Sequence, residues 1–141
     1  MLTDSTSIKK IEFLKSVGCM EKGHSGRDLY THLEGTRKEL EKLGAPEYLQ
    51  DAGLFHSVYG TTAFMSEDGL VSFNDRDKIV ELIGKQAEEI VWWFCMLEKP
   101  RDYNIEKLED GQLKNDLRLL SYANDVDQRP EENRLEYYNN V

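Results

Sequence analysis

Residues 51–61 read Asp-Ala-Gly-Leu-Phe-His-Ser-Val-Tyr-Gly-Thr. Just before this stretch, Pro46 and Glu47 suit the first turn of a helix, because that turn needs no N–H from proline and its positive dipole favours an acid. One side of that helix carries small, apolar or histidine side chains at helical spacing: Leu49, Ala52, Gly53 and His56. We therefore expect a helix over 46–58 with a histidine near its end.

The same periodicity continues on both sides of this stretch. Apolar residues three and four apart predict helices over 6–17, 26–43, 75–98 and 111–127, and Pro130 is expected to start a short last helix. Residues 59–74 break the pattern and suit a longer loop or a small hairpin. The sequence predicts an all-α bundle of six to seven helices in a single domain over 1–141. Its core spans about 6–127, and a C-terminal helix and tail follow over 128–141.

Composition narrows the classes of partner. The chain has 141 residues, of which 39% are hydrophobic and 32% charged, a balance typical of one globular core. It carries 27 acidic and 18 basic residues, a formal net charge of −9. Nucleic acid is therefore excluded as an expected partner, because neutralising its phosphates needs a basic face. The candidate partners are a small-molecule ligand and, for an interaction protein, a second copy of the chain with Trp92 or Trp93 at the contact.

No membrane or export signal is apparent. The longest apolar run, 90–97, is far shorter than the roughly 18 residues that span a bilayer. The N-terminus lacks a basic segment followed by an apolar one, as a signal peptide would have. Cys19 and Cys95 form no disulfide framework and suit buried thiols. We expect a cytoplasmic protein.

The three histidines, His24, His32 and His56, all lie between residues 24 and 56, about a quarter of the chain. His24 and His56 are separated by a predicted helix, a glycine stop and a second predicted helix. From residue 24 to 127 this order resembles the HD-domain superfamily, which comprises all-α metal-dependent phosphohydrolases and related di-iron oxygenases. In that family one histidine opens a helix, a His-Asp pair ends a following helix, and a last aspartate lies on a later helix.

The chain departs from that pattern at both acidic positions. Ser57 follows His56, and Asn124 aligns with the last aspartate, with Asp127 close by. The resemblance implies a metal site of His24, His56, Asn124 and Asp127 for Fe, Mn or Zn. Loss of two acids removes negative charge that helps to hold such an ion. A metal site and a metal-free pocket therefore both remain open.

The third histidine is predicted to have another role. If one helix carried both His24 and His32, their Cα atoms would lie about 12 Å apart, too far for two ligands of one ion. We expect His32 to line the pocket and to exchange protons near neutral pH, with Tyr59 as a second catalytic candidate.

Four further residues are candidates for contacting a ligand: Arg27, Ser57, Thr61 and Arg76. An arginine holds an anion through two parallel hydrogen bonds. A surface ion pair is nevertheless the favoured prediction for each arginine. Thr61 equally suits a loop cap. Glu88 is a possible substitute carboxylate, but a solvated helix face is the favoured prediction for it.

Three functions are compatible with these residues. The first is a metal-dependent hydrolase or oxygenase of HD-like type that acts on a small polar or phosphorylated molecule. The second is a metal-free ligand-binding or lyase-like protein on a degenerate HD scaffold. The third is an interaction protein without a reactive site.

Overall fold

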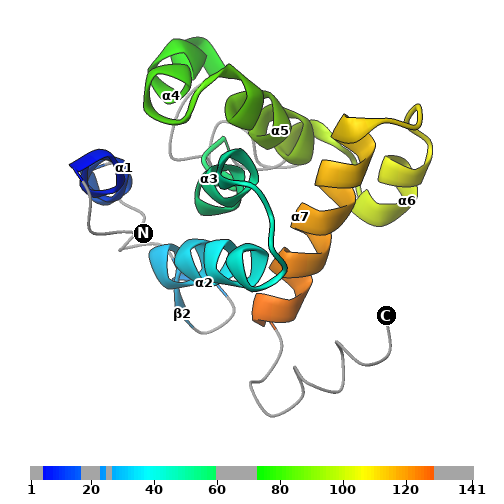
Figure 1. Cartoon of the computed structure of the whole chain (residues 1–141), viewed down its shortest axis with the longest axis horizontal. Coiled ribbons are helices and arrows are strands. Elements are labelled where there is room, and N and C mark those ends of the chain that lie inside the picture. Colours follow the sequence, from blue (N-terminus) through cyan, green and yellow to red (C-terminus); the bar gives the residue numbers. More distant parts are fainter. Residues whose placement is uncertain (1–4, 17–22, 25–26, 60–72, 129–141) are drawn as a thin grey trace.

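The computed structural model describes residues 5–16, 23–24, 27–59 and 73–128. This part of the chain is helical apart from one short antiparallel ladder of the strands β1 and β2 (Figure 1). The all-α prediction is confirmed. The elements are α1 (Ser5–Ser16), β1 (Gly23–His24), β2 (Arg27–Asp28), α2 (Leu29–Lys42), α3 (Glu47–Phe55), the 3-10 turn η1 (Phe73–Asp75), α4 (Arg76–Ile83), α5 (Lys85–Met96), α6 (Arg101–Glu106) and α7 (Gln112–Gln128).

Helix α3 lies in the middle of the bundle, between α2 and α5, and α7 crosses beside them (Figure 1). Helix α2 packs on α3 and α7, while α4 packs on α5 and α6 on α7. The apolar face of each helix meets in one core, as expected for amphipathic helices. Its largest fully buried apolar side chains are Leu14, Leu33, Leu40, Leu49, Leu54, Phe55, Tyr59, Ile79, Phe94, Ile105, Leu117 and Leu120.

The predicted helix over 75–98 is wrong as a single element. Gly84 interrupts it with φ +87°, a conformation that side chains other than glycine rarely adopt. Its N–H still donates to the Val80 carbonyl, so α4 ends there and α5 starts at Lys85. The break allows α4 to pack against α5. A glycine within an apolar periodic pattern does not reveal such a break, because helices also tolerate glycine at a modest cost.

Other boundaries differ by a few residues. The helix predicted over 26–43 begins at Leu29, because the ladder precedes it, and the one over 46–58 ends at Phe55 and continues in turns. Helix α7 matches the predicted 111–127, whereas α6 was not predicted. Most of the expected loop or hairpin over 59–74 and the helix from Pro130 lie outside the described residues.

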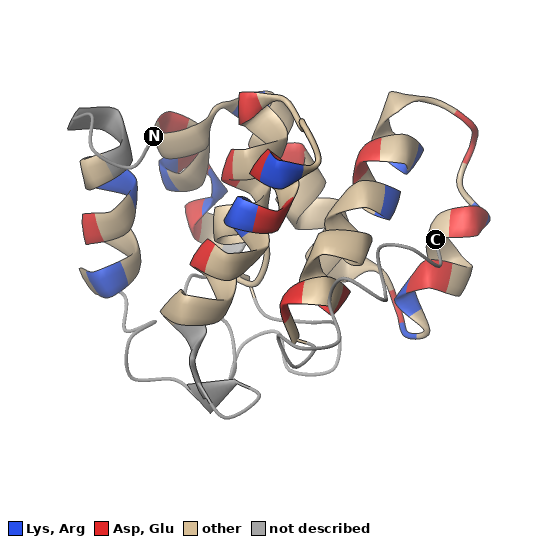
Figure 2. Ribbon diagram, turned by 60° about the horizontal axis from the view of Figure 1, so that its bottom comes forward, with Lys and Arg blue, Asp and Glu red and all other residues tan. Residues whose placement is uncertain are grey.

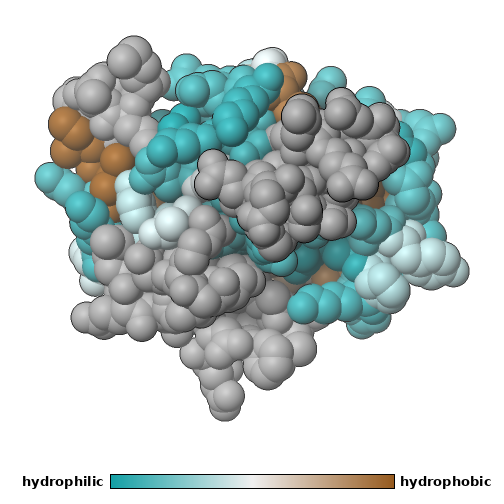
Figure 3. Space-filling model, turned by 90° about the horizontal axis from the view of Figure 1, so that it is seen from below, coloured by the Kyte–Doolittle hydropathy of each residue, from teal (hydrophilic) through white to brown (hydrophobic). Residues whose placement is uncertain are grey.

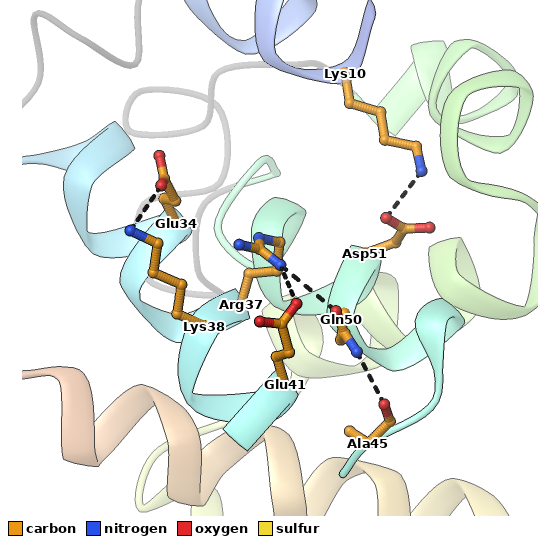
Figure 4. Close-up of polar contacts among 8 residues, drawn as sticks. All are labelled: Lys10, Glu34, Arg37, Lys38, Glu41, Ala45, Gln50 and Asp51. Carbon is orange, nitrogen blue, oxygen red and sulfur yellow. Dashed lines mark hydrogen bonds and ion pairs between the residues drawn. The ribbon is translucent and has the colours of Figure 1, made fainter. Parts of the chain in front are cut away.

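Helix α1 is held by apolar and polar contacts. The ring of Phe13 stacks on Phe55 at 6.3 Å, and the buried Lys10 pairs with Asp51 on α3 at 2.9 Å (Figure 4). Burial raises the pKa of Asp51 even with the Lys10 ammonium beside it. The cost of burying both charges therefore offsets much of their attraction.

A second polar group joins α2 and α3 in the same view. Arg37 of α2 contacts Glu41 at 3.3 Å and Gln50 of α3 at 3.5 Å, and Gln50 also donates to the Ala45 carbonyl (Figure 4). The Nε atom of Arg37 is the one buried side-chain polar atom, among those described, that has no hydrogen-bond partner. These contacts are long, so they contribute less to the α2–α3 contact than the apolar side chains do.

Acidic and basic residues alternate along the helix surfaces (Figure 2). Several form pairs one turn apart, such as Lys38 with Glu34 and Lys114 with Asp110. Most of the coloured surface in Figure 3 is hydrophilic. The large hydrophobic side chains exposed in the described segments are Ile8, Leu43 and Tyr103. None of the helices in these segments has both the length and the apolar character needed to cross a membrane.

Candidate functional site

A polar cluster is buried where α2 meets α7. His32 on α2 is 0% exposed, and its Nδ1 lies 2.7 Å from Oδ2 of Asp127. Its Nε2 lies 2.8 Å from Oδ1 of Asn124. Asn124 and Asp127 are three residues apart on α7, so the helix presents both side chains on one face toward His32. An imidazole in the core is therefore held at both ring nitrogens.

The two partners determine where the protons of His32 lie. A carboxylate only accepts hydrogen bonds, so Nδ1 carries the proton that is donated to Asp127. The bond between Nε2 and Asn124 forms in two ways. Either the ring is an imidazolium that donates to the amide oxygen, or the amide turns and donates its NH₂ to a neutral ring. In both states Asp127 orients the ring.

His56 is the second histidine of the cluster. It follows α3 directly, and its Nδ1 donates to the Gly53 carbonyl at 2.7 Å. Its ring meets that of His32 edge-on at 5.0 Å between centroids, and that of Phe94 edge-on at 5.5 Å. The sequence prediction placed His56 at the site, and the structure places it beside His32.

A separate polar network surrounds Glu88 of α5. The Glu88 side chain is 3% exposed, so the predicted solvated helix face is wrong for this residue. Arg76 binds its carboxylate with two parallel bonds of 2.7 and 2.8 Å, and the Tyr59 hydroxyl donates to it at 2.7 Å. The Arg76 guanidinium also lies over the Trp92 ring, 4.9 Å from its centroid. Sequence reasoning missed this network because 12 and 29 residues separate Glu88 from Arg76 and Tyr59.

This network changes the roles predicted for Tyr59 and Arg76. Burial, followed by the hydrogen bond to Glu88, raises the pKa of Tyr59 far above its usual range, so the phenol keeps its proton. The hydrogen bonds to Glu88 also raise the pKa of Arg76, although burial by itself lowers it. The structure thus pairs both residues with an internal carboxylate, which makes a structural role the simplest one for them.

The structure describes the remaining candidate residues only in part. Ser57 is half-buried in the turn after α3. The side chains of His24 and Arg27 and the whole of Thr61 lie outside the described residues, so their predicted roles stay predictions. Trp92 and Trp93 are both half-buried, with their rings edge-on at 5.7 Å. The homodimer contact predicted for them also stays a prediction.

The described side chains do not form a metal site as they stand. Within 5–16, 23–24, 27–59 and 73–128, no group of three or more His, Cys, Asp or Glu side chains has a geometry that would hold an ion. The donor chemistry agrees, because a histidine ligand must offer a lone pair to the metal and His32 has a partner at each nitrogen. The Fe, Mn or Zn site expected from the HD resemblance therefore depends on His24, and it requires Asn124 and Asp127 to release His32.

Gly35 is a site residue that sequence reasoning did not identify. It lies one turn after His32 in α2, and the Asp127 carboxylate occupies the space beside it. The available signal was a glycine in the interior of a predicted helix, where it is unfavourable unless packing or function requires it.

Cys95 lies next to the cluster and gives a direct test of its burial. Its thiol donates to the His56 carbonyl, and burial raises the pKa of Cys95 to about 12. In a Cys19→Ser variant, which leaves Cys95 as the single thiol, we expect labelling by a disulfide reagent at pH 8 to be slower than that of a free cysteine. The expected factor is about a thousandfold, because the thiolate is the reacting form. Unfolding in guanidinium should restore rapid labelling. Rapid labelling of the folded variant would contradict the packing around His56.

Comparison with known proteins identifies a family. A family model described as "Domain of unknown function (DUF6817)" matches residues 13–99. The match includes His32, His56, Arg76 and Glu88 and ends before α7, which supplies Asn124 and Asp127. No curated protein and no solved structure matches the chain. Because the matched region spans more than half of the sequence, the chain belongs to the DUF6817 family of domains of unknown function.

Proposed function

We propose that this protein binds a small polar or phosphorylated molecule and acts on it without a metal, by lyase-like acid–base chemistry at His32. The observation that supports this most is the buried pair of His32 and Asp127, with side chains 0% and 3% exposed and 2.7 Å between Nδ1 and Oδ2. In such pairs the carboxylate orients the imidazole and stabilises the imidazolium that forms when the ring takes a proton. His32 would exchange the proton and Asp127 would hold the ring.

The energetics favour a functional reading of this pair. Burying two ionisable groups in a core costs several kcal/mol per ion before their attraction is counted, and apolar residues of similar size are often at least as stable there. The cluster also lies among fully buried apolar residues such as Leu33, Ala123 and Val126. An ionisable pair that is kept at this cost is a candidate for catalysis.

The arrangement of helices supports the proposed relationship to HD domains. A histidine on α2 pairs with an aspartate on α7 and contacts a second histidine directly after α3, which is the order of elements in that superfamily. In this proposal His32 takes the position of the first histidine, which the sequence comparison had given to His24. Ser57 and Asn124 would then mark a branch in which acidic metal ligands have been lost.

A metal-dependent hydrolase or oxygenase is the second candidate. It is favoured by His56, whose Nδ1–H is held by the Gly53 carbonyl, which orients the ring. Histidine ligands of metals typically donate their other N–H to a carbonyl or carboxylate in this way. Fe, Mn or Zn would then need His24 and a His32 that has released Asn124. For either candidate we propose a reducing, cytoplasmic location, which suits the buried thiol of Cys95.

Thermal-shift screening with chelator present tests the first candidate against the second. The probes are sugar phosphates, nucleotides and hydroxy acids, each with EDTA, on the wild-type protein, on His32→Gln and on Asp116→Asn. A ligand at 100 times its Kd stabilises by about 2.7 kcal/mol, which is roughly 8 °C here. Asp116→Asn is the control, because Asp116 is a buried acid of α7 that is bonded to Tyr48. We expect one class of probe to give such a shift with the wild type and with Asp116→Asn, but not with His32→Gln.

Two outcomes would contradict the metal-free proposal. One is that no probe stabilises the wild-type protein. The other is that stabilisation appears only when Fe, Mn or Zn replaces EDTA, which would support the second candidate. Metal analysis of protein that was purified without added metal then identifies the ion.

A further inference from the structure

Helix α2 has a glycine in its interior, Gly35, three residues after His32. Glycine is among the least favourable residues at such a position, so its presence calls for a local reason. An ideal Cβ built on Gly35 would lie 2.0 Å from Oδ1, 2.6 Å from Cγ and 2.9 Å from Oδ2 of Asp127. All three of its nearest neighbours belong to this one carboxylate.

The other described glycines show that this contact is specific. At Gly53 the nearest atom to a built Cβ is the flexible end of Leu40, and at Gly111 nothing lies within 4 Å. Gly44 and Gly84 also have open space around them, and their positive φ angles account for glycine there. At Gly35, by contrast, no positive φ is involved, so the space taken by Asp127 is what excludes a side chain.

We infer that Gly35 is a positioning residue: the absence of its side chain seats the Asp127 carboxylate against α2 and thereby sets the proton on Nδ1 of His32. The carboxylate has one oxygen, Oδ2, on His32 and the other, Oδ1, over the Gly35 backbone. A methyl group at residue 35 would have to displace Oδ1 by roughly 1 Å or more to reach ordinary van der Waals contact. The 2.7 Å bond to His32 would not survive such a shift without rearrangement.

The consequence for His32 follows from its two partners. When Asp127 is displaced, Nδ1 loses its acceptor, while Oδ1 of Asn124 remains 2.8 Å from Nε2. The neutral ring then carries its proton on Nε2, so both its tautomer and its orienting group change. The significance of this for catalysis rests on the proposed function, but the protonation pattern itself does not.

The test is ¹H–¹⁵N NMR of the imidazole nitrogens in ligand-free protein with ¹⁵N-labelled histidine. The spectra of the wild type, Gly35→Ala, Asp127→Ala and Gly111→Ala are compared, with His32 assigned by its loss in His32→Gln. We expect a protonated Nδ1 in the wild type and in Gly111→Ala, the matched glycine with open space. Gly35→Ala and Asp127→Ala should share a different pattern, with Nδ1 unprotonated.

A folded Gly35→Ala protein with the wild-type pattern would overturn the inference, as would a wild-type Nδ1 without a proton. If Gly35→Ala does not fold, the double variant Gly35→Ala/Asp127→Ala decides. Removing the carboxylate makes room for the methyl group, and alanine is a better helix former than glycine, so the double variant should have a Tm equal to or above that of Asp127→Ala alone. A double variant less stable than Asp127→Ala would show that Gly35 is needed for another reason. Since no ligand is present, these results are independent of whether the thermal-shift screen finds one.

Discussion

Arg76→Ala should be much more destabilising than Arg118→Ala, although the two arginines make nearly the same contact. Each binds a glutamate 12 residues away through Nε and Nη2, at 2.7 and 2.8 Å for Arg76 with Glu88 and at 2.6 and 2.5 Å for Arg118 with Glu106. The pairs differ in burial. The Glu88 side chain is 3% exposed, whereas that of Glu106 is 54% exposed.

Burial determines the size of the loss. Without Arg76, the Glu88 carboxylate keeps only its bond to the Tyr59 hydroxyl among the contacts described above, and a buried charge without its counter-ion costs about 3 kcal/mol or more. We expect the lower end of that range, a fall in Tm of roughly 10 °C, because removing the partly exposed Arg76 lets water approach. Arg118→Ala should cost about 0–1 kcal/mol, as exposed ion pairs do.

Differential scanning fluorimetry of the two variants, with circular dichroism to confirm helicity, measures this difference. Glu88→Gln is an informative addition, because its amide oxygen still accepts from Tyr59 and Arg76 without carrying a buried charge. Its loss of stability should be smaller than that of Arg76→Ala. Equal effects of Arg76→Ala and Arg118→Ala would show that Glu88 is hydrated and that the network does not support the core.

Asp127→Ala should likewise be far more destabilising than Asp116→Ala on the same helix. Both aspartates are buried, with relative exposures of 3% and 5%. Asp127 accepts from His32, which is completely buried, whereas Asp116 accepts from the half-buried Tyr48 at 2.9 Å and from Gln112 at 2.7 Å. Tyr48 can turn its hydroxyl to water when Asp116 is removed, but the His32 N–H cannot.

We expect a loss of about 3 kcal/mol for Asp127→Ala, because it leaves a buried donor, or a buried charge, without its acceptor. Asp116→Ala should cost about 1 kcal/mol. Asp127→Asn should lie between the two, since its amide oxygen still accepts the Nδ1–H. Urea denaturation measures these differences from the midpoints, provided that the slope m is unchanged. If the two alanine variants are equally stable, the pairing of His32 with Asp127 contributes no more stability than the hydrogen bonds of Asp116.

The helices show how far sequence reasoning reaches. The periodicity of 111–127 predicted α7 closely, because its apolar positions repeat along a single uninterrupted helix. The break at Gly84 was missed because the apolar pattern continues through it from α4 into α5. Short α6 offered too few residues for a periodic signal.

The candidate site likewise has a part that was predicted from the sequence and a part that was not. His56, Asn124 and Asp127 were named from their places in a family pattern, and His32 was placed in the pocket. The contact of His32 with Asp127 joins residues 95 apart, and no local rule links them. Gly35 and Glu88 gained their roles from side chains on other helices, so their own sequence neighbours gave weak or misleading signals.

By itself the sequence determined the helical class and most helix positions, because these depend on local periodicity, capping residues and chemical type. Only the tertiary structure decided which histidine pairs with an acid, that Glu88 is buried, and why α2 carries a glycine. These features depend on how α2, α5 and α7 pack, and a pairing between helices is set by the whole core and not by any segment of it.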